Sequence, residues 1–282
     1  MKSIINGMIL IGLLVQVNFL LADIYRSQDA DGNISYSDKP TENAILQALN
    51  IIPQRYKNKV AYVYDGDTIK LENGKKIRLL GIDTPEVASH YQKATPGGNA
   101  AKKWLKKQLD GSDVYLEYDQ QQRDKYKRLL AHVFLENGEH INTALVKNGL
   151  AIVNLFPPNF RYKDELLAAQ KVAQQQQLGM WAMKRYQLTS ADKVRKVSGW
   201  KRYQGTVQSI KNNRKTVRLI LNKKLSVKIA KEHLYLFPDL ESYVGQSVEV
   251  RGWLSGKKAP FSILVRHPSA LILASPYGDR QH

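Results

Sequence analysis

The 282-residue sequence contains no cysteine. Disulfide bonds, thiolate metal sites, thiol nucleophiles and a lipid anchor on an N-terminal cysteine are therefore excluded. Long apolar runs are also scarce, and the main one covers residues 4–22, directly after a positively charged start. A basic start, an apolar stretch and a small residue at Ala22 are typical of a secretory signal peptide. We expect residues 1–22 to direct the protein out of the cytoplasm, to the periplasm or the medium.

The same run of about 19 residues is long enough to cross a bilayer if it is not cleaved. A retained membrane anchor is therefore the alternative to a cleaved signal peptide. Either way the segment indicates the cell envelope or the exterior.

Acidic side chains are few, with 25 Asp and Glu against 43 Lys and Arg, and the formal net charge is +18. The charge is uneven: residues 1–54 carry −2, residues 55–186 carry +8, and residues 187–282 carry +12. A strongly basic chain favours a polyanionic partner, either nucleic acid or an anionic membrane surface. A basic surface that only keeps the protein soluble is the simpler alternative.

Residues 23–50 contain two short strand-like runs on either side of the turn-forming segment 29–33, Asp-Ala-Asp-Gly-Asn. This pattern predicts a small hairpin. A calcium loop would need a distal bidentate glutamate that is missing here, so the turn is favoured. The pattern of Tyr25-Arg26, Gly32 and Tyr36-Ser37-Asp38 resembles a small domain of unknown function found in proteobacterial envelope proteins.

From residue 56 to residue 186 the predicted order of elements is β-β-β-α-β-β-α-α. Asn73-Gly74 marks a tight hairpin between the second and third strands, and Gly149 and Gly179 end helices. This order fits a five-stranded OB-type barrel with helices packed around it. Residues 187–198 are polar and basic and predict a linker. Residues 199–275 contain five more strand-like runs, so the predicted fold is mainly β with α, an OB-type barrel followed by a second small OB-like barrel.

Two short segments carry residues suited to phosphodiester hydrolysis. Asp67 is in a strand-to-strand turn, and Asp83 and Thr84 are at the end of the third strand. The carboxylate oxygens suit Ca²⁺ or a similar hard cation, and the segment 65–86 contains no histidine or cysteine that would favour zinc. Each motif alone also fits a plain turn or a helix start, so the combination carries the hypothesis.

Three motifs occur in order: V-x-D-G-D-T from Val63, R-L-x-G-I-D-T-P-E from Arg78, and D-x-Y-x-R-x-L-A from Asp124. Together they resemble the staphylococcal nuclease (thermonuclease) family, and the resemblance covers roughly residues 56–186. It implies that one Ca²⁺ is bound by Asp67, Asp83 and the Thr84 carbonyl.

The resemblance also implies the other roles in the site. The catalytic residues would be Arg78, Arg128 and Glu86, with Glu86 as the base or orienter of the attacking water. Guanidinium groups are suited to this role because they hold a phosphoryl group through two donors and stay charged. Lys125 and Tyr126 would hold the terminal phosphate and nucleotide, and Asp65 would lie in the outer shell of the metal.

This sequence departs from the family pattern in three places. Lys127 stands where glycine is common, the loop 87–98 looks short, and the stretch 154–158 lacks a tyrosine pair that often stacks on the base. Phe156 could stack instead or belong to the core.

The sequence therefore predicts a secreted, monomeric, calcium-dependent endonuclease of DNA and RNA with little sequence preference, which leaves 3′-phosphate ends and needs no organic cofactor. A non-catalytic nucleic-acid-binding module of the same fold is the alternative. Such a module would have lost at least one of the catalytic or metal-binding residues, and this sequence retains them all. An envelope protein whose basic tail binds anionic glycan or lipid is a third possibility. We expect the basic residues 199–275 to bind nucleic acid.

Overall fold

The computed structural model describes residues 24–29, 34–37, 45–47, 53–88, 93–196 and 199–274. The predicted signal peptide and most of the turn at 29–33 lie outside these residues. The chain forms two compact units, residues 1–53 and residues 54–282. Within the described residues, no helix is long and apolar enough to cross a membrane.

The first unit contains a three-stranded antiparallel sheet. Its strands are β1 (Ile24–Gln28), β2 (Ile34–Ser37) and β3 (Ile45–Gln47), in the order β2-β1-β3. The sequence predicted the hairpin of β1 and β2 but not the third strand, β3, which pairs with β1.

The second unit begins with a closed five-stranded barrel of order β4-β5-β6-β9-β8. Its strands are β4 (Tyr56–Val63), β5 (Thr68–Leu71), β6 (Lys76–Leu79), β8 (Asp113–Glu117) and β9 (Leu129–Phe134). The pair β6–β9 is parallel and the other pairs are antiparallel. The predicted Asn73-Gly74 hairpin joins β5 to β6, and Gly74 has the positive φ of 82° that such turns need.

Three helices and one short strand pair surround this barrel. They are α1 (Gly98–Leu109), α2 (Ile141–Lys147), α3 (Lys163–Gln175), and the pair β7 (Ile82–Asp83) with β10 (Ile152–Val153). The helix α1 buries Ala101, Leu105 and Leu109 against the barrel core, as their helical spacing predicts. The observed order is the predicted β-β-β-α-β-β-α-α with two-residue strands added.

A second set of strands follows, formed by β12 (Trp200–Thr206), β13 (Ser209–Asn212), β14 (Thr216–Ile220), β15 (Leu225–Ala230), β16 (Ser247–Ser255) and β17 (Phe261–Val265). Their order is β12-β16-β17-β15-β14-β13, and β15 and β17 are parallel. Only residues 207 and 208 separate β12 from β13, so the two ends of this path are consecutive in the chain. If β12 and β13 are taken as one bent strand, the strand order is the same as in the first barrel, and the predicted fold class is confirmed.

The edges of the second barrel carry two short strands, β11 (Leu188–Ser190) and β18 (Leu271–Leu273). The strand β11 lies in the segment 187–198, which the sequence predicted as a linker. It pairs in parallel with β12, and Ala191 just after it is buried in the second core. The polar composition of this segment hid the pairing because only one of its faces packs inward.

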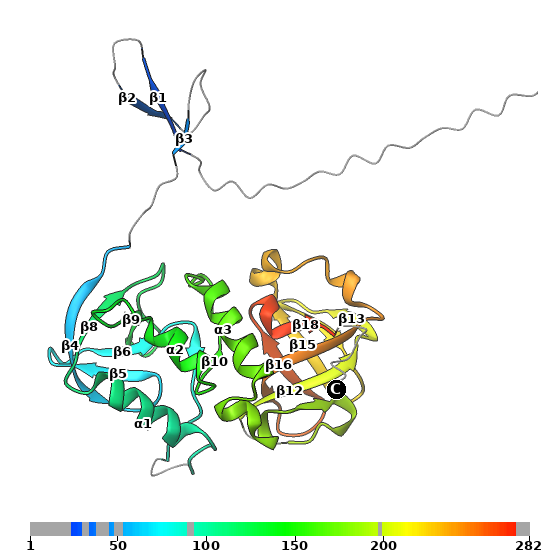
Figure 1. Ribbon diagram of the computed structural model, residues 1–282. Helices are drawn as coiled ribbons and strands as arrows, with labels where there is room; N and C mark the ends of the chain where they lie inside the picture. The colour runs from blue at the N-terminus through cyan, green and yellow to red at the C-terminus, as the bar shows by residue number, and fades with distance from the viewer. Residues whose placement is uncertain are drawn as a thin grey trace, which may run out of the picture. The chain divides into compact units, whose positions relative to one another are not determined.

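A separate apolar cluster joins the two barrels. It contains Met180, Trp181 and Tyr186 from the end of the first and Trp200 from the start of the second, and the rings of Trp181 and Trp200 are 5.8 Å apart. Figure 1 shows α3 and β10 between the strands of the two barrels. Because of this contact, residues 54–282 form one compact unit and not two barrels joined only by a linker.

Candidate active site

The central feature of the site is a guanidinium group held between two carboxylates. The β5–β6 register pairs Thr68 with Arg78, which brings Arg78 beside Asp67. The Arg78 Nε lies 3.1 Å from Asp67 Oδ1, and Nη2 donates to Asp83 Oδ1 at 2.7 Å. The Nη1 donates to the carbonyl of Leu79 at 2.8 Å. Two of the five guanidinium N–H groups are used in these hydrogen bonds and a third faces Asp67 in the ion pair, so two remain for a ligand.

Asp67 is almost completely buried, with 6% of its surface exposed, and its orientation is fixed from several sides. Its Oδ2 accepts hydrogen bonds from the Thr84 backbone N–H at 2.9 Å and from the Thr84 hydroxyl at 3.0 Å. Its Oδ1 also accepts from the Thr68 hydroxyl. Asp83 is held at the same place because β7 pairs with β10 through Asp83 and Ile152. Asp67 and Thr84, 17 positions apart in the sequence, thus meet at the Asp67 carboxylate.

Crowding of negative charge marks this site. Burial and the neighbouring Asp67 raise the pKa of Asp65 to about 6. Burial raises the pKa of Asp83 to about 7, although the charge of Arg78 opposes this shift. Burial works against the charge of Arg78, but Asp67, Asp83 and Asp65 together raise its pKa. Buried carboxylates that resist ionisation beside each other are the setting in which a bound cation is most stabilising.

Glu86 lies at the edge of the site with an exposed side chain. Its backbone carbonyl accepts from the Thr95 N–H at 2.8 Å. Gly98 at the start of α1 packs so closely that an added Cβ would meet the Glu86 carbonyl at 2.3 Å and the Pro85 carbonyl at 2.6 Å. Only glycine therefore allows α1 to lie against this segment, and that contact holds the backbone of Glu86 at the edge of the cleft.

Arg128 is positioned by a tight loop before β9. Its Nε donates to Asp124 Oδ2 at 2.7 Å, and its backbone N–H donates to Asp124 Oδ1 at 2.9 Å. The Tyr126 N–H donates to the same Oδ1. Asp124 thus holds both the loop and the guanidinium. It is part of the third sequence motif, although the motif alone predicted no role for it. An aspartate whose side chain accepts from the backbone N–H two residues later is a common turn signal, and it could have identified Asp124.

The loop tip presents Lys125 and Tyr126. Tyr126 is 67% exposed, and its ring has the Lys125 Nζ at 4.9 Å and the Arg128 guanidinium at 5.7 Å. Lys127 adopts a φ of 65°, the left-handed conformation that favours glycine. This explains why the resembled family commonly has glycine there.

All nine predicted residues line one cleft of about 650 Å³. They are Asp65, Asp67, Arg78, Asp83, Thr84, Glu86, Lys125, Tyr126 and Arg128. The cleft is also lined by residues that the sequence did not single out as site residues, among them Gln121, Asp124, Asn159 and Arg266. Phe156 lines it as well and is 46% exposed, so it is not a core residue.

The oxygen donors of this cleft fit a hard cation. Asp67 and Asp83 supply carboxylate oxygens, and Thr84, which follows Asp83 in the chain, offers its carbonyl. In the part of the chain that the structure describes, no three acidic or histidine side chains are arranged as a ready-made metal cluster. A cation here would therefore be held by two carboxylates, backbone oxygen and water, a donor set that also suits a substrate phosphate as a further ligand.

Comparisons with known proteins agree with this geometry. A sequence model described as staphylococcal nuclease homologue matches residues 76–183, and one described as Domain of unknown function (DUF4124) matches residues 11–63. The chain is 42% identical to the thermonuclease of Staphylococcus intermedius over 125 residues, which are 43% of this chain and 74% of the relative. It is 39% identical to the thermonuclease of Staphylococcus hyicus over 146 residues, 51% of this chain and 83% of the relative.

A third relative is Endonuclease YncB of Bacillus subtilis (strain 168), 37% identical over 127 residues, which are 43% of this chain and 60% of the relative. The first matched range begins at Lys76, so the structure rather than that match places Asp65 and Asp67 in the cleft. The relatives' names and the acid–arginine cleft agree on a nuclease hydrolase. The chain belongs to the staphylococcal nuclease family.

Proposed function

We propose that this nuclease is a secreted, calcium-dependent endonuclease that cuts DNA and RNA with little sequence preference and leaves 3′-phosphate ends. The observation that carries the proposal is the bridge from Asp67 through Arg78 to Asp83, with Arg128 in the same cleft. Hard oxygen donors and two guanidinium groups held by carboxylates line the same cleft, and phosphodiester hydrolysis requires both kinds of group.

In this proposal each side chain has a stated task. Asp67, Asp83 and the Thr84 carbonyl would hold Ca²⁺, and Asp65 would lie in its outer shell. The bound ion would neutralise phosphate charge and favour attack by water. Glu86 accepts a proton from the attacking water or orients that water. The water oxygen forms a new bond to phosphorus.

The bond from phosphorus to the 5′ oxygen then breaks, its electron pair leaves on that oxygen, which takes a proton from solvent water, and the phosphate stays on the 3′ end. Arg78 and Arg128 donate to the non-bridging oxygens as negative charge builds on them. Lys125 and Tyr126, exposed at the loop tip, contact the terminal phosphate and nucleotide. No base edge is read in this scheme, which is why little sequence preference is expected.

We also propose that residues 199–275 bind nucleic acid. Their positive charge and barrel fold suit binding of nucleic acid without sequence preference, which would keep the enzyme on its polymer. Deleting them would uncover Trp181 and Tyr186, which pack on Trp200. Substitutions in the full chain are therefore the better test of this role.

The decisive experiment is digestion of plasmid DNA and of RNA by the full chain with Ca²⁺, with Mg²⁺ or with excess chelator. We expect cleavage with Ca²⁺, its loss in chelator, and products whose 3′ phosphates are seen by mass spectrometry. Asp83→Asn should abolish most activity, while Asp113→Asn, at an exposed position on β8, should not. Full activity in excess chelator would overturn the calcium requirement.

A further inference from the structure

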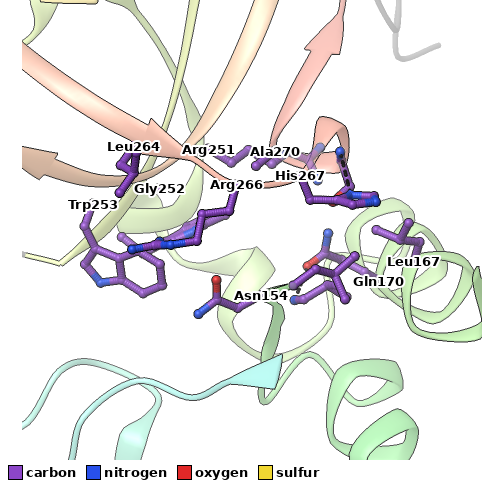
Figure 2. Close-up of a pocket in the computed structure, with 14 residues that line it drawn as sticks. Asn154, Leu167, Gln170, Arg251, Gly252, Trp253, Leu264, Arg266, His267 and Ala270 are labelled. Atoms are coloured by element: carbon purple, nitrogen blue, oxygen red, sulfur yellow. Dashed lines mark hydrogen bonds between the residues drawn. The ribbon is translucent and has the colours of Figure 1, made fainter. Parts of the chain in front are cut away.

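One residue of the second barrel reaches the active-site cleft. Among the described residues that line the cleft, Arg266, just after β17, is the one from beyond residue 199. Its guanidinium carbon lies 4.5 Å from the centre of the exposed Phe156 ring, on the opposite wall. Figure 2 shows Arg266 and Trp253 of the second barrel facing Asn154 of the first across a smaller neighbouring cavity, which Arg266 also lines.

Arg266 is a cation with no carboxylate partner among the described residues. It is only partly exposed, and burial lowers its pKa. A half-buried guanidinium stacked on an aromatic ring is suited to hold a phosphate through its N–H groups, while the ring offers a face to a base. Partial burial costs the Arg266 guanidinium some of its hydration, and a bound anion would compensate for that cost.

A row of cations continues from Arg266 across the outer face of the second barrel. Leu264, two residues before Arg266, is 37% exposed and therefore points outward. The strand registers pair Leu264 with Lys228, Lys228 with Arg218, and Arg218 with Lys211. Leu264 and the three cations Lys228, Arg218 and Lys211, one from each of four adjacent strands, thus form a row about 14 Å long at the usual strand spacing.

This row is not balanced by acidic residues. The segment 209–231 carries eight Lys and Arg and no Asp or Glu. Like charges directly opposite each other on neighbouring strands destabilise a sheet. The Arg218 Nε is also buried without a hydrogen-bond partner. A polyanion lying on the row would relieve both costs, and this face of the second and third strands is where OB folds bind oligonucleotides.

We propose that single-stranded nucleic acid leaves the active-site cleft over the Phe156–Arg266 pair and continues along Lys228, Arg218 and Lys211. This inference rests on the proposed nuclease function and names how its substrate is held. Arg266 is then a positioning residue that joins the catalytic barrel to the binding barrel. A strand covering the cleft and the row would fall within the range of roughly 4–16 nucleotides bound by one OB fold.

The test compares substitutions on the row with a matched pair off it. Arg218→Gln with Lys228→Gln removes two charges from the row, and Lys223→Gln with Lys224→Gln removes two from the exposed turn between β14 and β15 of the same barrel. Binding of fluorescent oligothymidylate of 4 and 20 nucleotides is measured in chelator, so that nothing is cut, over a range of salt concentrations. Unchanged melting temperatures verify that the variants fold.

We expect the row variant to bind the 20-mer on the order of tenfold more weakly, with a salt slope smaller by about 1.4, while the 4-mer is unaffected. The turn variant should change neither greatly. Arg266→Gln and Phe156→Ala should raise KM for cleavage of the 20-mer and leave kcat near the wild-type value. Equal losses in the row and turn variants, or wild-type binding by the row variant, would overturn the path.

Failure of the path and failure of the proposed function are distinguishable. If the row variant binds like wild type while the full chain cleaves with Ca²⁺, only the path is wrong. If the row and Arg266 variants lose binding while no form of the full chain cleaves, the path holds and the proposed chemistry is wrong.

Discussion

The two barrels have the same strand order and the same parallel closure, yet their chemistry differs at each corresponding position. The turn between the first and second strands carries Asp65 and Asp67 in the first barrel, but Arg214 and Lys215 in the second. The loop between the fourth and fifth strands carries Arg128, anchored by Asp124, in the first barrel. In the second barrel this loop carries Lys257 and Lys258 with no comparable anchor among the described residues.

The difference teaches that the barrel supplies positions and the side chains decide what happens there. A cation alone can bind a phosphate, whereas hydrolysis also needs carboxylates and guanidinium groups held in fixed geometry. The first barrel pays for that geometry with buried, crowded acids near Arg78. The second barrel keeps most of its basic side chains exposed or half-exposed, and the more buried Arg202 and Arg251 are paired with Glu249.

The strongest test of this contrast exchanges arginine for lysine in each barrel. Arg128→Lys keeps the charge but loses the two-donor fork, and should lower kcat by about 10²-fold or more. Arg218→Lys in the second barrel should leave kcat unchanged, since only charge is required there. Cleavage of a short oligonucleotide under saturating conditions measures both; equal rates for Arg128→Lys and wild type would remove Arg128 from the mechanism.

A smaller effect is expected from the anchor of that arginine. Asp124→Ala should lower kcat by roughly 10- to 100-fold, because the Arg128 guanidinium and the loop amides lose their common acceptor. Asp124→Asn keeps an acceptor oxygen and should recover part of the loss. The two variants are compared by kcat with Ca²⁺ saturating, and an Asp124→Ala enzyme with wild-type kcat would show that Arg128 needs no anchor.

The barrels should also differ in their response to acid. In the first, burial lowers the pKa of His132 well below its ordinary value, and burial outweighs the charge of Glu165 to lower that of His140. The unfolded chain therefore binds protons on these residues before the folded one does, and the free energy of unfolding falls as pH drops below about 6.5.

The second barrel instead buries Glu249, whose pKa Arg202 and Arg251 lower although burial alone would raise it. Its contribution to stability is present above the ordinary pKa of 4.5 and is lost only below it. We expect His132→Gln to flatten the melting temperature between pH 7 and pH 5, and Glu249→Gln to leave that slope as in wild type. A His132→Gln protein with the wild-type slope would contradict this account.

The smallest effect concerns the strained loop residue of the first barrel. Lys127→Gly relieves the left-handed conformation but adds flexibility to the unfolded chain, so the gain in stability should be about 1 kcal/mol or less. Lys127→Ala removes the same charge and keeps the strain. Denaturant unfolding of the two variants separates conformation from charge; an equal gain for alanine and for glycine would show that the lost charge, and not the relieved conformation, is responsible.

Much of the site could be predicted because its residues lie in three short motifs at strand ends. The barrel topology brings those strand ends together. The motifs therefore predicted that their site residues would lie close to one another, namely Asp67, Arg78, Asp83 and Arg128. The Asn73-Gly74 turn and the apolar face of α1 were equally local signals.

What could not be predicted depends on contacts between distant parts of the chain. Arg266 lies 110 positions from Phe156, and no local pattern marks it as a cleft residue. The division of the first strand of the second barrel at Val207, a fully buried residue, was also invisible in an alternating pattern. Tertiary packing decided both, and periodicity reports only the local face.

The order in which the two barrels can close is set by synthesis and not by the chain entropy of their parallel strand pairs. Ile77 pairs with Leu129 and Leu225 with Phe261, separations of 52 and 36 positions, so the two closures differ by only about 0.3 kcal/mol in chain entropy. Synthesis from the N-terminus delivers β9 before any strand of the second barrel, and domains fold as units during synthesis. The nuclease barrel can therefore close first. Trp181 then stays exposed on the nascent chain until Trp200 has been synthesised and packs against it.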